Sequence, residues 1–355
     1  MSEYWAYYGN TSDGAEQGVY VQSLDVSSFE AGAVRRVADA AFAGFQVIDP
    51  DERFLYSIDL KEGMGWVQSY AIDGATGGLS LVNEGKAAGG KLCYLGLDRS
   101  AQWVLGASYA DAVVTIFPVN GGGSLGDATF SMQRFEGSEV VAGRQAEAHA
   151  HSIYTDPTNQ YIFICDLGSD EILVGKFDSK KGLVDLDSIV SVPTVPGAGP
   201  RHLAFHPNGK WVFVINELNG SISSYHWEAS TGSLSLIDTV TTLPSDFVGK
   251  NTTAEIISST DGRFVYGSNR GHDSLVVYEI CPDSGRLNLI QTESTRGGHP
   301  RHFNISPCGQ TLLVANRDSD SIESFRIDRK SGKLEYVKRL AKVPTPTCVR
   351  FVVKE

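Results

Sequence analysis

Apolar runs separated by turn-forming residues recur along the whole chain, and Gly199–Glu217 shows the pattern most completely. One apolar run follows Arg201-His202 and ends at the turn signal His206-Pro207-Asn208-Gly209, and a second run ends in Asn216-Glu217. Two such runs joined by a tight turn predict a β-hairpin. Antiparallel strands place the start of one beside the end of the next. The hairpin therefore predicts that four polar residues meet at the end away from the turn: Arg201, His202, Asn216 and Glu217.

The hairpin pattern repeats with a period of about 50 residues. A short polar residue ends the second run of each repeat, at Asn10, Asp59, Ser108, Asp166, Asn216, Asn269 and Asn316. A third run follows, as at Ser274–Ile280, and a D-x-x-x-G turn leads to a fourth. Apolar residues do not recur at the 3.6-residue spacing of helices. The repeats predict an all-β fold, a seven-bladed β-propeller of four-stranded blades.

The two ends of the chain complement each other. Tyr4–Asn10 reads as a second strand with no first strand before it, whereas Thr347–Val353 reads as a first strand with nothing after it. We expect the C-terminal strand to complete the N-terminal blade and close the ring, which would remove an exposed sheet edge. Residues 1–355 are thus predicted to form a single domain. Gly121–Gly126 and Glu136–Ala148 are predicted loops, and the second leads directly into His149.

Composition limits the partners. The chain has 355 residues, a net charge of -12 and 41% hydrophobic residues. The acidic balance argues against nucleic acid and anionic membranes, although a local basic pocket for a small anion remains possible. No apolar run approaches the roughly 18 residues of a membrane helix. The N-terminus lacks a signal-peptide pattern, and the five cysteines are scattered singly, so we expect a cytoplasmic protein.

In a propeller, the first-strand starts and the second-strand ends open on one face. First-strand starts supply His149, His151, Arg201, His202, Arg301 and His302. Second-strand ends supply Tyr109, Asp166, Asn216, Glu217, Asn269, Arg270, Asn316 and Arg317. Arginines, histidines and a carboxylate that converge on one mouth suit a small, multiply charged anionic substrate. We expect the charge of Arg201 to face this mouth rather than the core.

Structural roles are open for part of this set. The recurring Asp166, Asn216, Asn269 and Asn316 fit turn caps, and Arg201 with Glu217 could form a purely structural ion pair. His149 and His151 could ligate a metal, but no carboxylate cluster accompanies them, so we expect neither a metal nor a cofactor. The chain has no G-x-S-x-G motif. Water, or a group of the substrate itself, is the expected nucleophile.

Several motifs together resemble one known family. They are Gly143-Arg144-Gln145, His149-Ala150-His151-Ser152, Asp166-Leu167-Gly168, Gly199-Pro200-Arg201-His202, Asn216-Glu217-Leu218, Ser268-Asn269-Arg270-Gly271-His272-Asp273 and Pro300-Arg301-His302-Phe303. Over essentially its whole length the chain resembles the seven-bladed propeller lactonases, which include propeller-type 6-phosphogluconolactonases and fungal 3-carboxy-cis,cis-muconate lactonizing enzymes. The resemblance implies four catalytic residues: His151, Arg201, Glu217 and Arg270. One departure is Cys93-Tyr94, where family members often carry Cys-His.

The resemblance implies a metal-free lactonase acting on a sugar lactone, such as 6-phosphogluconolactone or a related aldonolactone. Arg201 and Arg270 would hold the phosphate or the developing oxyanion. His151 would be the general base on water, since imidazole titrates near working pH, and Glu217 would orient Arg201 or assist proton transfer. Substrate-binding residues would be Tyr109, Arg144, Gln145, His149, His202, Asn216, Asn269, Arg301 and His302.

Two alternatives stay open at this point. In a carboxymuconate cycloisomerase, a substrate carboxylate would attack its own double bond, and His151 would protonate the resulting carbanion. The protein could also be a non-catalytic propeller that binds a ligand or another protein, because fold does not imply function. The convergence of charge at one mouth favours an enzyme. The sequence does not indicate an oligomeric state.

Overall fold

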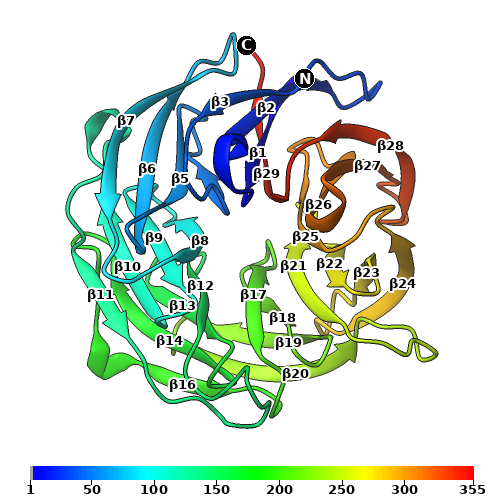
Figure 1. Ribbon diagram of the computed structural model, residues 1–355. Coiled ribbons are helices and arrows are strands. Elements are labelled where there is room, and N and C mark those ends of the chain that lie inside the picture. Colours follow the sequence, from blue (N-terminus) through cyan, green and yellow to red (C-terminus); the bar gives the residue numbers. More distant parts are fainter. Residues whose placement is uncertain (1–2) are drawn as a thin grey trace.

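The computed structural model describes residues 3–355, which form seven antiparallel sheets arranged around a central axis (Figure 1). The sheets are called blades 1 to 7 in chain order. Blade 1 has the strand order β29-β1-β2-β3, and in each of the other blades the chain runs outward from the first, innermost strand. The predicted all-β, seven-bladed propeller is confirmed.

Blades 1 to 3 contain the following strands. Blade 1 consists of β1 (Glu3–Asn10), β2 (Val19–Asp25), β3 (Arg35–Ala38) and β29 (Pro346–Val353). Blade 2 consists of β4 (Gln46–Ile48), β5 (Phe54–Lys61), β6 (Met64–Ile72) and β7 (Leu79–Lys86). Blade 3 consists of β8 (Leu92–Leu97), β9 (Trp103–Ser108), β10 (Val113–Pro118) and β11 (Phe130–Gln133).

Blades 4 to 7 follow the same plan. Blade 4 consists of β12 (Ala150–Thr155), β13 (Tyr161–Asp166), β14 (Glu171–Asp178), β15 (Leu183–Val184) and β16 (Val190–Pro193). Blade 5 consists of β17 (Pro200–Phe205), β18 (Trp211–Asn216), β19 (Ser221–Glu228) and β20 (Ser233–Thr241). Blade 6 consists of β21 (Thr252–Ser258), β22 (Phe264–Arg270), β23 (Ser274–Ile280) and β24 (Leu287–Ser294). Blade 7 consists of β25 (Pro300–Ile305), β26 (Thr311–Asn316), β27 (Ser321–Ile327) and β28 (Leu334–Lys342).

Helical structure within residues 3–355 is limited to four 3-10 turns, η1 (Gly14–Glu16), η2 (Gly121–Gly123), η3 (Leu186–Ser188) and η4 (Arg317–Ser319). The η3 turn divides the outer position of blade 4 into β15 and β16, and both pair with β14. The prediction of four strands per blade therefore needs this one refinement. No helix in the described residues has the length and apolarity required to cross a membrane.

The ring closes as the sequence predicts. Strand β29 pairs with β1 from Tyr4↔Val353 to Asn10↔Pro346, and the two lie side by side in Figure 1. Apolar side chains fill the spaces between neighbouring sheets. Between blades 4 and 5, for example, Phe163 packs edge-on against Trp227 at a centroid distance of 4.7 Å. Burial of such large side chains between blades is the main force that holds the ring together.

The inner strands share one irregularity that positions the site. Their pairing with the second strand is interrupted by a β-bulge near the start of β8, β12, β17, β25 and β29. The extra residue in the first four of these strands is Cys93, His151, Arg201 and Arg301, respectively. A bulge breaks the alternation of side chains between the two faces of a strand and redirects the extra residue. Equivalent side chains from four blades can therefore enter the same layer of the central channel.

Candidate active site

The bulge in β17 explains how the side chains of two adjacent residues, Arg201 and His202, both point into the central channel. In a regular strand, neighbouring side chains point to opposite faces. Here the Arg201 guanidinium lies 3.2 Å from a ring nitrogen of His202, so the two side chains meet. Arg201 also donates to the carbonyl oxygen of Ala254 at 2.7 Å. With only 2% of its surface exposed, the Arg201 side chain is buried at this end of the channel rather than open to solvent.

A single carboxylate, that of Glu217, organises the charged groups at this end of the channel. Arg201 Nε lies 3.1 Å from it, Arg270 Nη2 2.7 Å and Arg144 Nη2 2.5 Å. The three guanidiniums come from β17, from the end of β22 and from the loop at 136–148, respectively. Burial alone would raise the pKa of Glu217, but Arg270 and Arg201 hold it well below its usual value. Glu217 is therefore an ionised carboxylate shared by three cations.

His151 completes this group. Its Nε2 lies 3.9 Å from a carboxylate oxygen of Glu217, and its Nδ1 lies 4.0 Å from the Cys93 sulfur. Burial, together with the charge of Arg201, lowers the pKa of His151 well below 6.5. The expectation that this imidazole titrates near working pH is therefore wrong: His151 is neutral and has a lone pair available. Glu217, Arg144, Arg201, Arg270 and His151 are called the Glu217 cluster below, and it contains all four predicted catalytic residues.

Tyr109 and His149 form the neighbouring wall. Their rings stack at 4.2 Å with an interplanar angle of 3°. The Nδ1–H of His149 donates to the carbonyl oxygen of Tyr109 at 2.9 Å, which fixes the orientation of the ring. Arg144 lies 3.4 Å from the Tyr109 hydroxyl. The predicted loop Glu136–Ala148 thus reaches the Glu217 cluster through Arg144, which is 36% exposed and forms its outer edge.

Three predicted substrate-binding residues have structural contacts instead. Gln145 is fully buried, donating to the carbonyl of Leu167 and accepting from the amide of Val141, and so holds the Arg144 loop in place. Asn216 donates to the hydroxyls of Ser221 and Ser223 on the adjacent strand β19. Asn269 is likewise fully buried, and its amide group bonds to Thr242, Asn251 and Ser274. These contacts fit the anchoring role that the sequence left open for the recurring Asn positions.

His202 and His302 face a carboxylate that the sequence analysis missed. Glu255 lies 3.1 Å from His202 Nδ1 and 3.4 Å from His302 Nε2. His302 Nε2 in turn lies 3.0 Å from Nη1 of Arg350. Glu255 could have been found from the repeat, because it occupies the irregular segment of β21 between Thr253 and Ile256, near the start of that inner strand. A row of polar side chains therefore continues along the channel from Arg201 to Arg350.

Tyr94 is the residue at which the sequence departs from the family that it resembles. Its ring packs edge-on against His202 at 5.2 Å and lies 4.7 Å from the ring of Phe45. Tyr94 thus joins the layer of His202 and His302, whereas Cys93 before it occupies the bulge position. Burial raises the pKa of the Cys93 thiol to about 11, so this sulfur is protonated beside His151.

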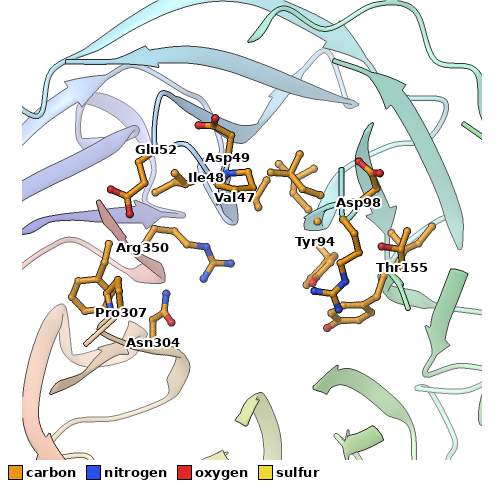
Figure 2. Close-up of a pocket in the computed structure, with 18 of the residues that line it drawn as sticks. Val47, Ile48, Asp49, Glu52, Tyr94, Asp98, Thr155, Asn304, Pro307 and Arg350 are labelled. Atoms are coloured by element: carbon orange, nitrogen blue, oxygen red, sulfur yellow. The ribbon is translucent and has the colours of Figure 1, made fainter. Parts of the chain in front are cut away.

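A cavity of about 520 Å³ lies at the opposite end of the channel. Turn residues that join first and second strands line it, among them Asp49, Asp98 and Pro307. Figure 2 shows Arg350 and Asn304 pointing into this space, with Tyr94 across from them. Asp49 and Asp98 accept hydrogen bonds from backbone amides of their own turns. Asp49 and Asp98 therefore stabilise the turns that line this cavity. The arginines and His151 that surround Glu217 lie at the other end of the channel.

Two predictions are left to compare with the structure: the position of Arg301 and the possible metal ligation by His149 and His151. Arg301 occupies the bulge of β25, as Arg201 does in β17. Within residues 3–355, no group of three or more His, Cys, Asp or Glu side chains is arranged to hold a metal ion. What the Glu217 cluster offers chemically is a set of fixed guanidinium donors and a neutral imidazole around one ionised carboxylate.

Comparisons with known proteins agree with this arrangement. The family model described as "Lactonase, 7-bladed beta-propeller" matches residues 5–351. The chain is 32% identical over 355 residues to a 6-phosphogluconolactonase of Bacillus subtilis, with 99% of each chain covered. It is 35% identical over 326 residues to a 6-phosphogluconolactonase of Formosa agariphila, with 90% of each covered. The solved structure of the periplasmic gluconolactonase PpgL of Pseudomonas aeruginosa matches with a TM-score of 0.93 at 29% identity, covering all of both chains. The chain belongs to the seven-bladed β-propeller lactonase family.

Proposed function

We propose that this protein hydrolyses the ring ester of an aldonolactone, with 6-phosphogluconolactone as the leading substrate. The observation that carries the proposal is the Glu217 cluster, in which a neutral imidazole lies beside three guanidiniums that one carboxylate holds in place. Ester hydrolysis needs two elements: a base that takes a proton from water, and fixed donors for the oxyanion of the tetrahedral intermediate.

His151 is the proposed proton carrier. Its neutral ring accepts a proton from the water whose oxygen attacks the lactone carbonyl carbon, and the C–O double bond becomes a single bond to an oxyanion. The imidazolium formed next to Glu217 is a strong acid, because burial and the nearby Arg201 lower the pKa of His151. It returns the proton to the ring oxygen as the carbonyl re-forms and the ring C–O bond breaks. The product is an open-chain hydroxy acid, which ionises in solvent.

Arg270 is the proposed donor to the oxyanion. A guanidinium has five N–H donors, and Arg270 directs Nη2 at Glu217. Nη2 also donates to the Thr253 carbonyl, and Nε is buried without a hydrogen-bond partner among residues 3–355, so Nη1 is the donor left for the oxyanion. Arg201, by comparison, uses Nε for Glu217 and Nη1 for Ala254 and His202. Glu217 then serves as the counter-ion that fixes these cations, rather than as a base, because its pKa is held low.

The test is direct assay of the purified protein. We expect it to accelerate the loss of 6-phosphogluconolactone or glucono-1,5-lactone above the spontaneous rate, and to leave 3-carboxy-cis,cis-muconate unchanged. Cyclisation of the muconate without lactone hydrolysis would overturn the proposal in favour of the cycloisomerase. EDTA should leave the rate unchanged, since the proposed chemistry uses no metal. Loss of activity in EDTA with recovery on adding a divalent cation would refute the metal-independent mechanism.

A further inference from the structure

Arg301 differs from the other arginines at this mouth in having no partner. Its guanidinium makes no hydrogen bond, ion pair or aromatic contact with any of residues 3–355. By contrast, Arg144, Arg201 and Arg270 all bond to Glu217. Buried and half-buried guanidiniums are normally satisfied by carboxylates or carbonyl groups. An arginine without such a partner indicates an anion that binds from outside the chain.

The position of Arg301 within the channel is fixed by the β-bulge of β25. This bulge is equivalent to those that bring His151 and Arg201 into the Glu217 cluster. Arg301 therefore belongs to the same layer of the channel, but on blade 7 rather than on blades 4 to 6. Burial, followed by the charges of Arg201 and Arg270, lowers the pKa of Arg301 to about 9. An anion near Arg301 would relieve this repulsion.

Lys91 is a second cation on this side of the mouth. It directly precedes β8, and its ammonium lies 3.6 Å from the ring centroid of Phe42. It forms no ion pair in the described part of the chain. Burial of the ammonium, followed by the charge of Arg301, lowers the pKa of Lys91, while Asp13 acts in the opposite direction. The mouth therefore has a neutralised half around Glu217 and an uncompensated half at Arg301 and Lys91, on which Glu217 and Asp13 act only at a distance, without an ion pair.

We propose that Arg301 and Lys91 form a binding site for the phosphate ester of the substrate, which orients the lactone ring toward His151 and Glu217. This inference rests on the proposed lactonase function and assigns its substrate class as a phosphorylated aldonolactone. A phosphate dianion matches two unpaired cations, and arginine recognises phosphate through paired N–H donors. It also changes the expectation from sequence that Arg201 and Arg270 hold the phosphate, because both are committed to Glu217.

The test compares 6-phosphogluconolactone with glucono-1,5-lactone in wild type, Arg301→Gln and Lys91→Gln. Loss of one charge-assisted contact should raise KM for the phosphorylated lactone about 10- to 100-fold in Arg301→Gln. Lys91→Gln should have a smaller effect in the same direction, since this lysine is exposed. Because the charge of Arg301 also lowers the pKa of His151, kcat can change for both lactones, but KM for the unphosphorylated lactone should change at least several-fold less than KM for the phosphorylated one. Inorganic phosphate should inhibit wild type competitively and inhibit Arg301→Gln more weakly.

Controls separate the two proposals. Arg286→Gln removes an arginine that pairs with Asp238 at the outer edge of its blade, and should change neither KM. If Arg301→Gln does not fold, Arg301→Lys keeps the charge but loses the paired donors, and should show an intermediate KM. Equal effects on both lactones would refute the phosphate site while leaving the lactonase function intact. Wild type that hydrolyses only the unphosphorylated lactone would refute it as well. Wild type that hydrolyses neither would instead refute the proposed function.

Discussion

At the scale of single residues, Glu217 determines the geometry of the site. Glu217→Gln keeps the shape of the side chain but leaves three guanidiniums without a counter-ion. Breaking a buried ion pair in this way typically costs about 3–5 kcal/mol, and small displacements of catalytic groups cost roughly 100-fold in rate. We therefore expect a lower melting temperature together with a loss of kcat of about 100-fold, measured by calorimetry and lactone assay.

The matched control for this prediction is Glu293→Gln. Glu293 also pairs with an arginine, Arg296, but near the surface, where the arginine side chain is 48% exposed, the Glu293 side chain is 20% exposed, and ion pairs contribute little. It should change neither the melting temperature nor kcat noticeably. If Glu217→Gln behaves like this control, the Glu217 cluster is not the catalytic centre.

A second prediction at this scale concerns three of the buried histidines. Burial lowers the pKa of His151, His202 and His302 well below 6.5 in the folded protein. In the unfolded chain they titrate near 6.5, so the unfolded state binds more protons once the pH falls below that value. Stability rises with pH wherever the unfolded state binds more protons. The stabilisation is therefore complete above about pH 6.5 and is lost as the pH falls below it.

The expected slope is large. Each extra proton taken up by the unfolded state lowers the free energy of unfolding by about 1.4 kcal/mol per pH unit. Urea unfolding between pH 7.5 and 5.5 should show this decline, and His302→Gln should reduce its slope. A free energy of unfolding that is constant over this range would show that these histidines bind protons equally in both states.

At the scale of structural elements, the β-bulges mark the limit of what sequence could predict. The hairpin pattern and the turn at His206–Gly209 indicated correctly that Arg201 and Glu217 meet at one end of the hairpin. Pattern reading could not reveal the bulge between Pro200 and His202, because it lies at the polar start of the strand, before the apolar run begins at Leu203. For this reason the burial of Arg201 and the shared channel layer of the bulge residues emerged only from the structure.

The anchoring residues show a related limit. Asn216 and Glu217 are neighbours at the end of β18, and the sequence gives both a polar side chain at the mouth. Only the structure shows that Asn216 bonds to β19 while Glu217 bonds to the arginines. The direction of a side chain at a strand end depends on partners that are distant in sequence, such as Arg270.

A turn of one blade that packs against the neighbouring blade gives a prediction at the scale of structural elements. Gly182, in the turn between β14 and β15, has φ +64 and packs against the Trp103 ring of blade 3. An added Cβ would lie 2.2 Å from that ring, and the Trp103 indole N–H donates to the nearby Ser179 carbonyl. Gly182→Ala should therefore destabilise the protein by about 2–3 kcal/mol, from left-handed backbone strain and overpacking combined. The rate per folded molecule should not change.

Gly209→Ala is the matched control for the turn. Gly209 has φ +70, but an added Cβ there meets nothing within 4 Å. This variant should show only the backbone strain, about 1 kcal/mol. Equal melting temperatures for the two variants would mean that the Gly182–Trp103 contact does not hold blades 3 and 4 together.

At the scale of the whole molecule, the residues that stabilise the propeller and the residues of the candidate active site lie in different places. The large apolar side chains lie between blades, whereas the inner strands present the polar row that runs from Arg201 to Arg350. An acidic protein with a net charge of -12 can therefore concentrate its cations at one channel mouth. The fold class and ring closure were predictable because the same pattern of apolar runs and turns recurs along the chain, so that a single irregular residue does not obscure it. The division of the mouth into a neutralised and an uncompensated half depends on individual side-chain contacts, which the pattern does not contain.

Ring closure gives the last prediction, which concerns the truncation of the chain after Leu340. This change removes β29, the inner strand of blade 1, whose ladder with β1 extends from Tyr4↔Val353 to Asn10↔Pro346. The backbone groups of β1 would lose their partners, and each buried unpaired group costs roughly 1–3 kcal/mol, against a total stability of about 5–15 kcal/mol. We expect a protein that is insoluble or melts without cooperativity. Truncation after Val353 keeps the whole strand, and should melt close to the full-length protein. A protein ending at Leu340 that stays soluble and monomeric, with a cooperative transition near the full-length temperature, would show that β29 is not required to hold the ring closed.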